Sequence, residues 1–161
     1  MPGPGYNAAT VLVIAAILSA LHLFALALGL SAIYLRGRAL RGPLDDAGLR
    51  RLFTADNVWG VAAALWLVTG LLRAFAGFEK GSAFYLGSVM FWAKMALFLA
   101  IVLLEIRPML TLIGWRRIVA RGGRPDTSPA RRLYVITHVE MALAAVTVFI
   151  AAFMARGFGA R

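Results

Sequence analysis

The sequence predicts an all-α integral membrane protein: a bundle of four bilayer-crossing helices that form a single domain over residues 1–161. Three observations predict this class. Hydrophobic residues make up 61% of the chain and the mean hydropathy is +0.81, whereas soluble domains have an apolar usage of roughly 45–50%. The apolar residues gather in four long runs, and most of the basic residues lie between those runs.

Each apolar run approaches or exceeds the roughly 20 residues that a helix needs to cross a bilayer. The expected helices cover about residues 8–35, 58–76, 86–115 and 133–154. Glycine, proline and charged residues connect them at 37–51 and 116–132, and a short outer turn is expected at 77–85. Because the connections are short, consecutive helices should be antiparallel neighbours. Thr54 and Asp56 are the expected caps of the second helix.

Charge decides the expected orientation. Eleven of the 17 basic residues follow the first and third runs: Arg36, Arg38, Arg41, Arg50, Arg51, Arg116, Arg117, Arg121, Arg124, Arg131 and Arg132. Cytoplasmic loops of membrane proteins carry such an excess of positive charge. Both segments are therefore expected in the cytoplasm, with both chain termini outside. The formal charge of +10 then reflects topology, so the expected partner is the lipid bilayer and no nucleic acid is expected.

The composition and the motifs exclude several function classes. The chain has no cysteine, which excludes disulfides, iron–sulfur clusters and thiolate chemistry. Nucleotide-binding, zinc-protease, hydrolase and EF-hand motifs are also missing from the sequence. No catalytic residue is identified by sequence pattern, and whether the chain is an enzyme stays open.

The chain carries one internal similarity. The tetrapeptide RRLF at 50–53 and the helix after it resemble RRLY at 131–134 and its helix. This similarity indicates two helical hairpins that are parallel repeats about an axis along the membrane normal. Chance similarity between apolar helices is the alternative.

Ionisable residues inside the membrane are costly unless they have a partner, so each marks a candidate site. They are His22, Lys94, Glu105, Arg107, His138 and Glu140. His22 lies near the middle of the first helix, where a neutral imidazole suits an axial haem ligand; a hydrogen bond across the bundle is the alternative. Lys94 is either an interfacial anchor or a counter-charge for a buried carboxylate or a cofactor propionate.

The other four of these residues lie toward the cytoplasmic third. Intramembrane charges usually pair with one another, which favours a structural salt-bridge cluster of Glu105, Arg107, His138 and Glu140; a proton relay is the alternative. Counted from the cytoplasmic helix ends, the Cα atoms of His22 and His138 differ by on the order of 12 Å in depth. A haem held between these two histidines is therefore disfavoured, and its second ligand stays open.

Several stretches resemble known families. The segments ALHLFALALGLSAIYLRGRAL, FWAKMALF and LEIRPMLTLIGWRR resemble the DUF2214-type family of predicted bacterial membrane proteins. That resemblance covers nearly the whole chain and implies a multi-pass protein of the bacterial inner (plasma) membrane. The His in the first helix and the Trp-x-Lys in the third, here His22 and Trp92-Ala93-Lys94, also resemble the HemJ-type protoporphyrinogen oxidases. The general layout is similar to the CopD-type membrane proteins.

The HemJ-type resemblance implies a bound haem b, with His22 as the iron ligand and Lys94 as a second cofactor contact. The segment YLRGRALRG departs from the HemJ-type pattern. The leading hypothesis is a haem b- or porphyrin-binding redox protein that works with a membrane redox partner or as a homo-oligomer. The alternative is a non-enzymatic accessory subunit, or a small metal- or solute-handling membrane protein, whose polar residues lock helices together.

Overall fold

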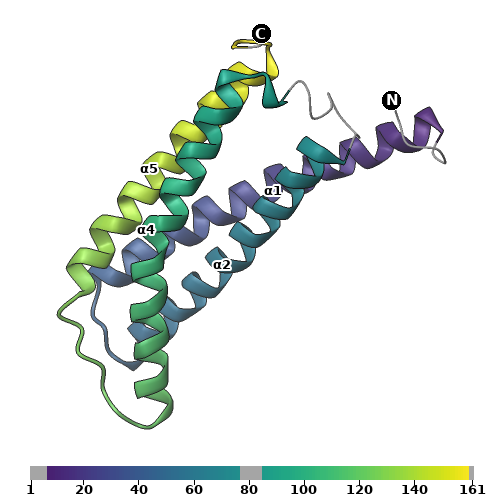
Figure 1. The fold of residues 1–161 in the computed structure, drawn as a ribbon. Helices are drawn as coiled ribbons and strands as arrows, with labels where there is room; N and C mark the ends of the chain where they lie inside the picture. The colour runs from purple at the N-terminus through teal and green to yellow at the C-terminus, as the bar shows by residue number, and fades with distance from the viewer. Residues whose placement is uncertain (1–6, 77–84, 160–161) are drawn as a thin grey trace.

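The computed structural model describes residues 7–76 and 85–159, which form a bundle of four long helices (Figure 1). The helices are α1 (Ala8–Arg41), α2 (Asp46–Phe75), α4 (Val89–Ala120) and α5 (Ala130–Ala155). α1 packs along α2, α4 packs along α5, and α1 also contacts α5. The two short loops lie at one end of the bundle, and the described chain ends lie at the other. The predicted all-α, four-helix class is confirmed.

The helices extend further at the loop end than hydropathy predicts. α1 continues to Arg41 and α2 begins at Asp46, whereas the apolar runs end at 35 and begin at 58. Hydropathy marks the part of a helix that touches lipid, but arginine is also a good helix former in water. The 34 residues of α1 measure about 51 Å, against a hydrocarbon core of roughly 30 Å. The loop ends of α1 and α2 therefore project beyond the membrane.

A tight turn joins α1 to α2. Asp45 caps α2 by accepting a hydrogen bond from the Gly48 backbone nitrogen at 2.7 Å. A Cβ on Gly48 would collide with the carbonyl oxygen of Pro43, so this turn requires glycine. The expectation that Thr54 and Asp56 cap the helix is wrong, because both lie well inside α2. Apart from its last residue, the outer turn expected at 77–85 lies outside the described residues.

The surface of the bundle is apolar. Leu12, Phe24 and Phe149 are 71%, 65% and 67% exposed, and many other large apolar side chains also point outward. Soluble monomers rarely expose such contiguous apolar surface. All four helices of the described chain are long and apolar enough to cross a bilayer. The outward side chains therefore contact lipid, and the interior carries the polar groups.

The buried residues of each helix form a narrow stripe that faces the interior of the bundle. The stripe of α1 recurs at intervals of three or four positions and comprises Leu18, His22, Ala25, Gly29, Ala32, Ile33, Arg36, Gly37 and Leu40. Residues at these spacings share one helix face. Small residues within the stripe let α2 approach closely, since a Cβ on Gly29 would lie only 3.3 Å from the Trp59 ring.

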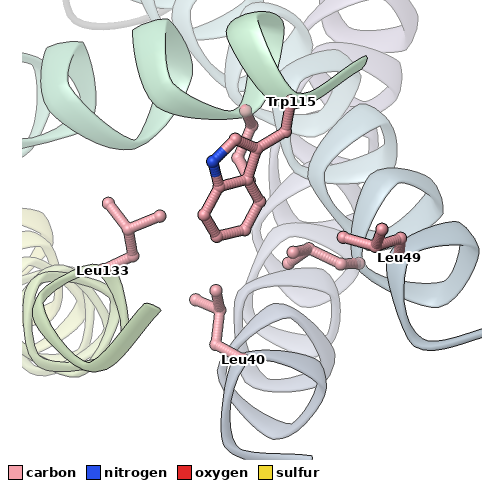
Figure 2. Packing of buried hydrophobic residues seen from close by; sticks show 6 residues of the cluster. Leu40, Leu49, Trp115 and Leu133 are labelled. Atoms are coloured by element: carbon pink, nitrogen blue, oxygen red, sulfur yellow. The ribbon is translucent and has the colours of Figure 1, made fainter. Parts of the chain in front are cut away.

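An apolar layer closes the loop end of the bundle, and every helix contributes to it. Its buried members are Leu40, Leu49, Leu52, Leu112, Trp115 and Leu133. Figure 2 shows Leu40, Leu49 and Leu133 grouped around the indole ring of Trp115. A second apolar layer lies further from the loops and contains Ala32, Ile33, Trp59, Ile101 and Ala144. The space between the two layers holds the first candidate site.

The charge distribution predicts the orientation of this bundle in the membrane. Alkaline phosphatase fused after Arg161 should be active, because the enzyme matures only outside the cytoplasm. The same reporter fused near Gly122 should be inactive there, since the basic loops are retained inside. A fluorescent protein that matures in the cytoplasm should give the opposite pattern at the two positions. Activity of the phosphatase at Gly122 together with inactivity at Arg161 would contradict the N-out arrangement.

Candidate functional site

Arg36 of α1 binds one carboxylate from each of the other three helices. Its Nη1 donates to Glu105 Oε1 at 2.7 Å and to Asp56 Oδ1 at 3.1 Å. Its Nη2 donates to Glu105 Oε2 at 2.9 Å and to Glu140 Oε2 at 2.6 Å. The side chains of Arg36 and Glu140 are fully buried. These four residues form what we call the Arg36 cluster, which ties all four helices together.

Two further donors hold the carboxylates of the cluster. Trp59 Nε1 donates to Glu105 Oε2 at 3.0 Å. Arg116 Nη2 donates to Asp56 Oδ2 at 2.8 Å and to the carbonyl oxygen of Phe53 at 3.1 Å. The Arg116 side chain is 31% exposed at the loop end of the bundle. The cluster is therefore buried in the middle and reaches water through Arg116.

Helical spacing places the cluster between the two apolar layers. Arg36 lies four residues before Leu40, and Glu140 lies seven residues after Leu133; both leucines belong to the apolar layer at the loop end. Residues four or seven positions apart lie on the same face of a helix. The layers enclose the charges on both sides, and the side chains of Asp56 and Glu105 are only 11% and 21% exposed. Each charge therefore depends mainly on its partners within the cluster.

The structure separates the four residues that the sequence analysis grouped together. It brings Glu105 and Glu140 to one guanidinium, as described above, whereas Arg107 is exposed on the surface of α4. His138 lies outside the cluster, where its Nδ1 donates to the Tyr134 carbonyl oxygen at 2.8 Å.

Arg36 is not among the site residues predicted from the sequence, because it follows the first apolar run and is grouped there with the basic residues of the loop. The signal was its position three residues after Ile33 and four before Leu40, which continues the buried face of the helix. A charged residue that lies three or four positions from buried residues of the same helix shares their face. It is therefore a candidate buried charge, even at the edge of an apolar run.

A second polar group lies nearer the chain ends, around His22. Its Nδ1 is 2.8 Å from Thr69 Oγ1 of α2, and that hydroxyl donates to the Leu65 carbonyl oxygen at 2.6 Å. A hydroxyl has one proton to donate, so the bond to His22 must come from the imidazole. Nδ1 therefore carries the proton and Nε2 carries the lone pair. This is the tautomer in which a histidine binds a metal through Nε2.

Packing also fixes the imidazole of His22. Its ring stacks on Trp66, with the ring centroids 5.8 Å apart and an interplanar angle of 28°. A Cβ on Gly70 would lie 3.2 Å from His22 Cε1, so glycine gives the imidazole its room. Trp66 in turn meets Phe98 of α4 edge-on at 6.0 Å. Residues of α2 thus hold the imidazole of His22 in place, and the indole of Trp66 links α2 to α4.

A cavity of about 430 Å³ lies beside His22, and described residues of all four helices line it. Its size is within the range of small-molecule sites, roughly 300–1,000 Å³. Lys94 and Arg73 line the same cavity. Much of the remaining wall is aromatic and consists of Trp66, Phe75, Tyr85, Phe91 and Phe98. We call this space the His22 cavity. His138 is not part of the described lining.

One buried donor on the wall has no partner among the described residues. The indole Nε1 of Trp66 is buried and makes no hydrogen bond to any described residue, although buried donors are normally paired. The described residues contain no group of three or more His, Asp or Glu side chains able to hold a metal ion. A haem brings four ring nitrogens of its own and needs only one or two protein ligands. The donor set around His22 fits such a group.

These features define a multi-pass integral membrane protein, whose four helices are joined by buried charges at one end and enclose a cavity toward the other. The chain belongs to the family described as "Predicted membrane protein (DUF2214)", whose model matches residues 14–159. The predicted family is thereby confirmed. Neither the curated proteins nor the solved structures contain a match to the chain.

Replacing Arg36 tests whether the cluster locks the bundle. Arg36→Gln should lower the free energy of unfolding by about 3–5 kcal/mol, because the carboxylates around it would stay buried without their cation. The control Arg38→Gln removes the same charge from an exposed position two residues away. It should leave the unfolding midpoint nearly unchanged. Thermal unfolding in detergent, followed by circular dichroism, compares the two variants. Equal midpoints would contradict the structural role and favour the proton relay.

Proposed function

We propose that this protein is a redox protein of the bacterial inner membrane that binds haem b, or a closely related porphyrin, in the His22 cavity. One observation carries the proposal: His22 and Lys94, which lie on different helices, line the same cavity. The sequence had singled out both residues for independent reasons, one as an imidazole deep in a helix and the other as a cation in an apolar run. Their convergence on one space of suitable size supports a shared ligand.

The tautomer of His22 suits iron binding. Thr69 accepts the proton of Nδ1 and itself donates to the Leu65 carbonyl oxygen, so the lone pair of the neutral imidazole lies on Nε2. Partners of this kind set the tautomer and the ring orientation of metal-binding histidines. Bound haem would supply one-electron chemistry, and the protein supplies the ligand, the orientation and the burial.

The walls of the cavity match the remaining features of a porphyrin, which is a flat apolar ring with two carboxylates. The aromatic side chains named above suit the faces of the ring. Lys94 and Arg73 are cations on long side chains and suit the two carboxylates. The thioethers of Met95 and Met154 also line the cavity and are candidates for a second axial ligand.

The resemblance to HemJ-type enzymes makes protoporphyrinogen oxidation the first activity to assay. Electrons would then leave through a membrane redox partner or a second copy of the chain. If no cofactor binds, the alternative is an accessory subunit or a solute-handling protein that holds another apolar anion in the same cavity.

Absorption spectra test the proposal directly. Protein purified from haem-sufficient cells should show a Soret band and a b-type spectrum on reduction. His22→Ala should abolish the band, and Lys94→Ala should weaken haem retention. The control His138→Ala removes a histidine that lies outside the cavity and should leave the band intact. A colourless wild-type protein that also fails to take up added haemin would refute haem binding.

Thr69 provides a finer test, because it acts on iron only through the imidazole. Thr69→Val keeps the shape of the side chain and removes the acceptor of Nδ1–H, so haem affinity should fall about 10–100-fold. Thr147→Val is the matched control, since this buried threonine donates to its own helix, at Leu143, and also lines the cavity. Titration with haemin measures both affinities. Equal losses would show that Thr69 has no specific role in holding His22.

A further inference from the structure

A second hollow lies along α1 and α2, and it shares no described lining residue with the His22 cavity. It has a volume of about 840 Å³, and its described lining residues belong to these two helices and to Gly42, which follows α1. At the loop end its wall is basic, with Arg38, Arg50 and Arg51. Further into the membrane its wall is apolar and includes Leu28 and Val58. We call this hollow the α1–α2 groove.

The arginines of the groove differ from those of the Arg36 cluster. All three are exposed, and none of their side chains has a hydrogen-bond or ion-pair partner among the described residues. Arg36 and Arg116, by contrast, are both bound to carboxylates. Like charges gathered in one place repel each other and attract an anion. Thr54 also lines this part of the groove and offers a hydroxyl donor.

We propose that the α1–α2 groove binds an anionic phospholipid of the cytoplasmic leaflet. Its phosphate lies against Arg38, Arg50 and Arg51, and one acyl chain follows the apolar wall toward the membrane centre. The order of the groove matches the order of a phospholipid, with charge at the membrane surface and hydrocarbon beneath it. The cytoplasmic leaflet is rich in anionic lipids, and basic pockets between helices bind their headgroups.

Two other occupants fit the groove less well. A soluble phosphate would use the arginines but would have no contact with the apolar wall. A second copy of the chain, related by a two-fold axis, would bring its own three arginines toward the first set. That arrangement would place six positive charges together. A lipid satisfies both the basic and the apolar part of the surface.

Native mass spectrometry of the detergent-solubilised protein tests this proposal, with dioleoyl phosphatidylglycerol and dioleoyl phosphatidylcholine offered at equal concentration. Wild-type protein should retain phosphatidylglycerol in preference, by at least about tenfold, since each arginine near the surface contributes appreciably to anionic lipid binding. The triple variant Arg38→Gln, Arg50→Gln, Arg51→Gln should lose this preference.

The chain supplies a matched control in the other hairpin. Arg121, Arg131 and Arg132 are also exposed at the loop end, and residues 131–134 repeat the pattern of 50–53 without lining the groove. Their triple replacement by Gln removes the same charge and should retain the lipid preference of the wild type. Circular dichroism checks that both variants keep their helices, and the single variant Arg50→Gln replaces the triple if it does not fold.

Several outcomes would overturn the proposal. Equal retention of the two lipids by wild-type protein would exclude a headgroup site. An equal loss in the control variant would show that total charge, and not the groove, attracts the lipid. Displacement of the lipid by millimolar glycerol 3-phosphate would identify a site for soluble anions. A dimer that disappears only in the groove variant, without a change in lipid retention, would identify an interface between copies. None of these outcomes depends on haem binding.

Discussion

The arrangement of the bundle depends on the buried guanidinium of Arg36. Lipid tails are as apolar as the helix surfaces, so the hydrophobic effect gives membrane helices little reason to choose particular neighbours. A buried cation with three carboxylate partners does determine which helices pack together. Asp56, Glu105 and Glu140 come from three different helices and reach Arg36 within 2.6–3.1 Å. Each helix must therefore take one position and one rotation relative to α1.

The cluster also marks one end of the bundle as different from the other. Apolar layers on both sides enclose the ion pairs near the loops, where all four helices meet. In Figure 1 the α1–α2 and α4–α5 hairpins lie close together at that end and diverge toward the chain ends. The His22 cavity lies in this wider half. The ion pairs and apolar layers hold the helices together near the loops, and the cavity lies where the two hairpins diverge.

The arginines at the loop end have three different physical roles. Arg36 is fully buried among carboxylates, Arg116 links Asp56 to the surface, and Arg38 with its neighbours on α2 lines an exposed groove. Sequence patterns for membrane topology treat all of these residues as one signal, because orientation depends only on the excess of positive charge. Burial and partners distinguish them, and these are properties of the folded bundle.

The sequence by itself determined the membrane class, the four helices and the candidate status of His22, Lys94, Glu105 and Glu140. Hydropathy is a local property, and ionisable residues within apolar runs are conspicuous. The tertiary structure alone decided the helix ends, the central place of Arg36 and the exposure of Arg107. It also decided that Thr69 and Trp66, which carry no charge, hold the His22 ring. Contacts between helices depend on how each helix is rotated and tilted, and a nearly uniform apolar surface does not encode either quantity.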